Sequence, residues 1–235
     1  MNSVFAKVAV AALAFSIRVA SSPIISTPGH TSVSTLPGPS SPIIGTPGHT
    51  SVGTLPATPS VGTVQVVKHY VDITNTAVRG DMNQILTAID ASVAAQAGLI
   101  AAIKADLNSV ASQFASAGTA IANSTAGVAV TLTAPEVLAL VSTLSTVQLL
   151  AASLLVQYNI AKGRLLQATL VATQAEFKAA LSAIKPFSDP LVAYAAQVQQ
   201  QGGVAAGTTG AALRMSSAAM QQSINILLGS LGVSV

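Results

Sequence analysis

The sequence contains no cysteine and no tryptophan, and it is poor in charged and aromatic residues. Without cysteine, disulfides, thiolate metal ligands and cysteine nucleophiles are excluded, so packing alone must hold the folded part together. Charged residues make up 7% of the 235 residues, whereas about a quarter is usual in soluble proteins. This composition indicates either a membrane protein or a soluble domain whose surface is built from Ala, Ser, Thr and Gln.

The positive net charge gives no indication of nucleic-acid binding. Of the ten Lys and Arg residues, Lys7 and Arg18 belong to the N-terminal segment, which leaves eight against seven Asp and Glu, a net charge of +1. The remaining basic residues form no cluster, and the few aromatic residues are scattered. Nucleic acid therefore has no electrostatic binding site in this chain.

Residues 1–20 predict a secretory signal peptide. Lys7 supplies the positive charge, Val8–Ile17 is a short apolar core, and small residues follow it. Arg18 interrupts the apolar run before it reaches the roughly 20 residues that a membrane anchor needs. We therefore expect a secreted protein.

Residues 21–63 predict a disordered Ser/Thr/Pro/Gly linker that contains a tandem 19-residue repeat. SSPIISTPGHTSVSTLPGP (Ser21–Pro39) is followed at once by SSPIIGTPGHTSVGTLPAT (Ser40–Thr58). Proline and glycine disfavour regular elements, and Ser/Thr with Pro is typical of O-glycosylated stalks. His30 and His49 recur because the segment is duplicated, and a metal site would need further ligands in fixed geometry. We interpret the repeat as a spacer and predict no metal.

Residues 64–235 predict an all-α bundle of five or six amphipathic helices, because apolar residues recur there with helical spacing. The expected apolar stripes are Val78, Met82, Ile85, Leu86, Ile89 and Val93; Ile100, Ile103, Leu107, Val110, Phe114 and Ile121; Val137, Leu140, Val141, Leu144, Val147, Ala151, Leu154 and Tyr158; Leu166, Leu170, Phe177, Leu181 and Ile184; Leu191, Tyr194 and Val198; and Leu213, Met220, Ile224, Leu227 and Leu228.

Turn and cap residues predict where these helices begin and end. Gly98 is expected to break the chain before the second helix, and Thr133-Ala-Pro-Glu136 is a capping box that starts the third. Lys185-Pro186 should stop the fourth helix, and Ser188-Asp189-Pro190 should start a fifth. Glycines 202, 203, 207 and 210 are expected to separate the last helix.

The third helix has no charge between Val137 and Ala161 and is long enough to span a bilayer. A polar side on the helical wheel nevertheless favours a soluble bundle helix. Leu138, Leu149 and Leu150 fall outside the apolar arc, which indicates burial on more than one side or an unusually apolar surface. The residues expected on the polar side are Ser142, Thr143, Ser145, Thr146, Ser153 and Gln157.

Catalytic and recognition motifs are weak. His69, beside Lys68 and Tyr70, is the only histidine after the linker, and no Ser-His-Asp arrangement or carboxylate pair is evident. We predict neither an enzyme nor a cofactor. Arg79-Gly80-Asp81 falls on the first apolar stripe, so its likeness to a cell-adhesion motif is attributed to chance. Asn123-Ser124-Thr125 is a glycosylation sequon expected in a loop.

Three segments of the helical part carry a family resemblance: ILTAIDASV (Ile85–Val93), LTAPEVLALVSTLSTVQLLAASLL (Leu132–Leu155) and FKAALSAIKPF (Phe177–Phe187). From about Asp72 to Leu228 the chain resembles the hydrophobic surface-binding protein A family, the fungal cell-wall galactomannoproteins. The glycine-rich break at Gly202–Gly210 is more pronounced than that family's pattern. The resemblance implies a secreted or wall-associated, non-enzymatic protein that adsorbs to hydrophobic surfaces. It also implies that fatty acids bind within the bundle, and that secreted hydrolases and cell-wall polysaccharide are partners.

The hypothesis is thus a lipid- or hydrophobic-surface-binding bundle behind a Ser/Thr/Pro spacer. Lys162 or Arg164 is expected near a carboxylate head group. The alternatives are a structural wall mannoprotein without ligand, a membrane-active or membrane-spanning helical protein, and an unrecognised hydrolase. If an internal pocket exists, its expected lining is Phe114, Leu144, Leu154, Tyr158, Phe177, Leu181 and Tyr194.

Overall fold

The computed structural model describes residues 62–91, 96–128, 131–200 and 207–233. The chain divides into two units, Met1–Thr54 and Leu55–Val235, and every described residue belongs to the second. The predicted signal peptide at 1–20 and the predicted linker with its repeat, up to residue 61, lie outside the described residues, as do Val93, Gly202 and Gly203.

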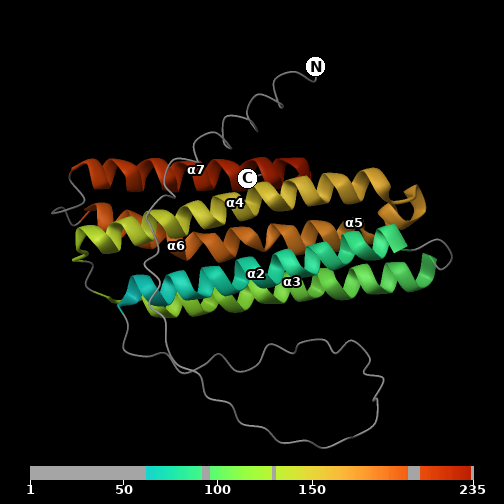
Figure 1. Ribbon diagram of the computed structural model, residues 1–235, viewed down its shortest axis with the longest axis horizontal. Coiled ribbons are helices and arrows are strands. Elements are labelled where there is room, and N and C mark those ends of the chain that lie inside the picture. Colours follow the sequence, from blue (N-terminus) through green and yellow to red (C-terminus); the bar gives the residue numbers. More distant parts are fainter. Residues whose placement is uncertain (1–61, 92–95, 129–130, 201–206, 234–235) are drawn as a thin grey trace, which may run out of the picture. The chain divides into compact units, whose positions relative to one another are not determined.

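The described part of the chain is an all-α bundle, as the sequence predicts (Figure 1). Its helices lie roughly side by side along one long direction, and they alternate in direction along the chain except at the α5–α6 junction, where one helix continues the course of the other. Their bounds are α2 Thr63–Ala91, α3 Gln96–Thr125, α4 Ala134–Arg164, α5 Gln167–Ser182, α6 Ile184–Gln200 and α7 Thr208–Ser230.

The helices pack as a closed ring. α2 contacts α3 and α4, α3 contacts α5 and α6, α6 contacts α7, and α7 contacts α4 along much of its length. Two hydrogen-bonded contacts between α2 and α4 join residues 74 apart in sequence, Asn83 with Gln157 and Asp90 with Arg164. Gly62, the residue before α2, lies beside Glu136 in the first turn of α4, again 74 residues apart. A constant separation means that α2 and α4 run parallel and in register, although they are not consecutive helices.

The first helix is longer than its predicted stripe. α2 begins at Thr63, and the apolar period continues toward its N-terminus through further buried positions. Backbone N–H groups of Gln65 and Val66 donate to the Gly62 carbonyl, so the glycine caps the first turn. The additional buried residues are Val64, Val67, Val71 and Thr74.

Two glycines predicted as breaks lie inside helices. α3 begins at Gln96, so Gly98 belongs to its first turn, and no other side chain approaches within 4 Å of where its Cβ would be. Gly210 is buried in the first turn of α7. An isolated glycine costs a helix only about 1 kcal/mol relative to alanine, which the packing of a long helix outweighs.

The proline-bearing junction between α5 and α6 lies earlier than predicted. α5 ends at Ser182, and α6 already contains Pro186 in its first turn and Pro190 within it. A helical Pro186 would clash with the carbonyl of residue 182, four positions earlier, which accounts for the end of α5 at that residue. Leu166, predicted on the apolar stripe, is instead the exposed residue that precedes α5.

The junction packs closely against the C-terminal third of α3. A Cβ on Gly118 would lie 3.0 Å from both the Phe187 Cα and the Pro186 carbonyl oxygen. The neighbouring ring of Phe114 contacts that of Phe187, with centroids 5.3 Å apart. A side chain at position 118 would therefore require the backbone of Pro186 and Phe187 to move away.

Candidate functional site

All seven residues predicted to line a pocket are buried in a single hydrophobic core. The rings of Tyr158 and Phe177 contact each other across α4 and α5, with centroids 5.6 Å apart. Phe114 instead contacts Phe187, which the sequence prediction did not include. These aromatic residues belong to the packed core, so the core positions are as predicted, and a ligand among them stays a prediction.

Tyr194 places an unpaired hydroxyl in this core. Its side chain is fully buried on α6, and its phenolic oxygen has no hydrogen-bond partner. Burial raises the pKa of Tyr194, and the negative charge of nearby Glu136 raises it further. Because a carboxylate is close by, this end of the core is electrostatically unfavourable for the carboxylate of a fatty acid.

Glu136 caps α4 as the sequence predicts. Its Oε2 atom accepts hydrogen bonds from the backbone N–H of Thr133 at 2.8 Å and from the Thr133 hydroxyl at 2.7 Å. These bonds lower the pKa of Glu136, the hydroxyl contributing more than the N–H. The capping box therefore places a stabilised negative charge at the positive end of the α4 dipole.

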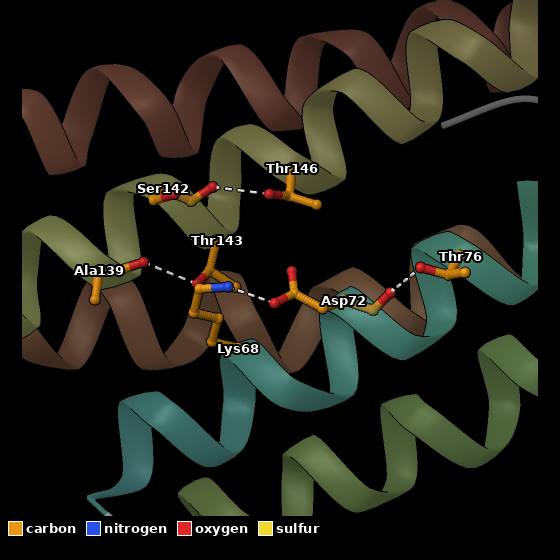
Figure 2. Close-up of polar contacts among 7 residues, drawn as sticks. All are labelled: Lys68, Asp72, Thr76, Ala139, Ser142, Thr143 and Thr146. Carbon is orange, nitrogen blue, oxygen red and sulfur yellow. Dashed lines mark hydrogen bonds and ion pairs between the residues drawn. The ribbon is translucent and has the colours of Figure 1, made fainter. Parts of the chain in front are cut away.

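Many hydroxyl groups of the bundle are satisfied within their own helix. Figure 2 shows Thr143 donating to the carbonyl of Ala139 at 2.8 Å, and Thr146 donating to that of Ser142 at 3.1 Å. A hydroxyl that bonds to the carbonyl four residues earlier no longer needs water or a neighbouring helix. Serine and threonine therefore give these helices a less polar surface than their composition suggests.

The predicted polar side of α4 is wrong at two positions. Thr143 and Gln157 are buried where α4 packs against α2. The internal hydroxyl bond explains Thr143, and the Gln157 amide donates to Asn83 Oδ1 at 2.9 Å. Leu150 is buried too, so α4 is apolar on a broader arc than a single core-facing stripe.

The outward side of α4 exposes large apolar side chains. Leu138, Leu149 and Val156 are 57%, 51% and 58% exposed, and they share one side of the helix. By length and composition α4 could cross a membrane, a test that core helices of soluble proteins also pass; only 44% of its most apolar stretch is buried. We call the exposed side, defined by these three residues, the α4 ridge.

The charged residues of the described chain lie around this ridge rather than on it. Within α4 they are Glu136 in the first turn and Lys162 and Arg164 in the last. Arg164 pairs with Asp90 of α2 at 2.7 Å and is therefore engaged at the helix end. Elsewhere ion pairs join Lys68 with Asp72, Lys104 with Glu176, and Lys185 with Asp189.

Three sequence motifs are placed by the structure. Arg79-Gly80-Asp81 is helical in α2, and Asp81 accepts a hydrogen bond from Gln113 at 2.9 Å, unlike an exposed adhesion loop. The sequon Asn123 lies in the last turn of α3 rather than in the predicted loop. Thr125 of that sequon is buried, and its hydroxyl donates to the Ile121 carbonyl. His69 is exposed on α2 beside Tyr70.

Comparison of the chain with protein-family models, curated proteins and solved structures finds no match in any of the three. The resemblance to hydrophobic surface-binding protein A therefore stays a hypothesis. The geometry of the bundle is the basis for the functional proposal.

Proposed function

We propose that the protein is a secreted, non-enzymatic, cell-wall-associated protein that binds hydrophobic surfaces or lipids such as fatty acids. The observation that carries this proposal is the α4 ridge. Three large apolar side chains are exposed along a helix whose charges are confined to its ends. Burying such a side chain contributes roughly 1.5–3 kcal/mol, so contact with an apolar phase is favourable without polar recognition.

The exposed α4 ridge also argues against the alternative of a structural wall mannoprotein without ligand. A purely structural role does not require exposed Leu and Val on the charge-free middle of α4, and such a surface favours aggregation unless something covers it. Recruitment of secreted hydrolases and contact with wall polysaccharide belong to the same hypothesis as the surface binding.

The test is depletion of the full chain from solution by alkyl-coated beads, compared with uncoated hydrophilic beads. We expect saturable loss from solution on the alkyl beads only. A parallel titration with a fluorescent fatty acid, aided by the absence of tryptophan, measures ligand per chain. Equal depletion by both bead types together with no saturable fatty-acid signal would contradict the proposal and favour a structural wall role.

A further inference from the structure

We infer that the binding surface is the shared outer face of α4 and α7, which lies flat against an uncharged apolar phase. This inference rests on the proposed function and specifies which surface performs it. The face consists of the α4 ridge together with two exposed residues of α7, Met215 and Ile226. The partner is an apolar phase without charged groups, such as an alkane-like or wax-like layer.

The contact between α4 and α7 brings these residues to one side of the molecule. Ser216 of α7 lies 3.2 Å from Ser145 of α4, hydroxyl to hydroxyl, and also donates to the Val141 carbonyl at 3.2 Å. These bonds define which edge of each helix faces the other.

Helical geometry then places the apolar side chains on either side of this contact. At 3.6 residues per turn, every residue of the α4 ridge lies within about 40° of Ser145 around the helix. Met215 and Ile226 lie about 80–100° from Ser216, on the side away from buried Leu213. Met215 is the most exposed large apolar residue among those described, at 68%.

The absence of charge on this face determines what can bind it. α7 carries one charged residue, Arg214, and it lies about 100–120° around the helix from Met215 and Ile226. On the α2 border of α4, Lys68 pairs with Asp72 and Asp90 pairs with Arg164 (Figure 2 shows the first pair), and the exposed Arg79 belongs to α2 and so lies outside the face. A charged partner that covered this face would bury its own charges without a counter-charge, which is unfavourable. An uncharged apolar phase has no charges to bury.

The extent of the face favours a surface over a single lipid molecule. From Leu138 to Val156 the ridge extends about 27 Å along α4, at 1.5 Å per residue. The side chains project outward from a helix that is itself packed on α2 and α7. A convex strip of this length can contact a flat apolar surface along its whole length. It is poorly shaped to enclose a single acyl chain.

The experiment measures adsorption to neutral alkyl-coated beads of full-length variants that carry a new negative charge either on the proposed face or elsewhere on the surface. The test variant is Leu149→Glu with Met215→Glu. The matched control is Ile73→Glu with Val171→Glu, two exposed apolar residues on α2 and α5. A buried carboxylate is strongly disfavoured, so we expect at least about tenfold weaker adsorption for the test variant and less than about twofold change for the control.

The outcomes separate this inference from the proposed function. No adsorption by the unmodified chain would overturn both. Equal adsorption by the unmodified chain and both variants would overturn the assigned face and leave the proposed function standing. Tighter binding to anionic vesicles than to neutral alkyl beads would contradict the uncharged partner. Conversion of a dimer to a monomer by the test variant, without weaker adsorption, would mean that a second copy covers the face.

A second variant guards against misfolding. Leu149→Ser with Met215→Ser introduces no charge, and both positions are exposed, so helix content by circular dichroism should be unchanged. We expect its adsorption to fall between those of the unmodified chain and the glutamate variant. Adsorption as strong as that of the unmodified chain would contradict the assigned face.

Discussion

At the residue scale, the bundle depends on how serine, threonine and glycine are used. Threonines that bond to their own helix, such as Thr143 and Thr173, occupy buried positions that a polar classification assigns to solvent. Gly118 allows two backbones to approach, whereas Gly80 has open space around its Cβ position. Glycine thus allows a close backbone contact at one position and lies in open space at another, and the sequence alone does not distinguish the two.

This contrast gives a paired prediction. Gly118→Ala should destabilise the fold by about 1–3 kcal/mol, because the new methyl group meets the backbone of Pro186 and Phe187. Gly80→Ala, in open space on α2, should stabilise it by about 0.5–1 kcal/mol through helix propensity. Urea unfolding followed by circular dichroism measures both. Similar effects of the two substitutions would argue against the close approach at position 118.

At the element scale, the sequence predicts the number and type of helices and most of their core residues. Thr133 to Glu136 predicts the start of α4 because a capping box is a local signal. The ends that it misplaces, at Gly98 and Lys185-Pro186, depend on packing that outweighs local propensity. The register between α2 and α4 is a contact between distant segments, so no local pattern contains it.

The cap of α4 makes its stability dependent on pH. Hydrogen bonds lower the pKa of Glu136 below its ordinary value of 4.5. The ionised carboxylate therefore contributes its full stabilisation of the fold above pH 4.5. The contribution is lost as the pH falls through the lowered pKa of the folded state. Glu136→Gln should therefore lower the melting temperature by a few degrees at neutral pH and leave it unchanged in strong acid. A constant difference at every pH would refute this.

The candidate site was only partly predictable. Helical periodicity places the seven core residues correctly, and Leu138 and Leu149 already stand out as apolar residues away from the core. Met215 and Ile226 carry no such signal, because membership of one face requires knowing that Ser216 of α7 contacts Ser145 of α4. A shared face between non-consecutive helices follows from the tertiary structure alone.

At the scale of the whole molecule, low charge makes the surface insensitive to ionic screening. The described ion pairs neutralise much of the charge that is present, and the face formed by α4 and α7 carries none. Long-range electrostatic attraction therefore contributes little to encounter with a surface.

This neutrality predicts how adsorption depends on salt. Between about 0.05 M and about 0.5 M sodium chloride, adsorption of the full chain to neutral alkyl beads should change less than about twofold, since screening acts only on charges. Bead depletion at a series of salt concentrations measures this. A steep fall with added salt would indicate that ionic contacts, rather than the apolar side chains, hold the protein at the surface.

The parallel pairing of α2 with α4 also bears on the order in which the chain folds. Both partners of α4 are distant in sequence: the contacts with α2 join residues 74 apart, and those with α7 join residues 71 and 75 apart. Contacts at such separations form late, after local helix pairs. During synthesis the shared face of α4 and α7 is therefore complete only when the last helix has been made and has docked on α4.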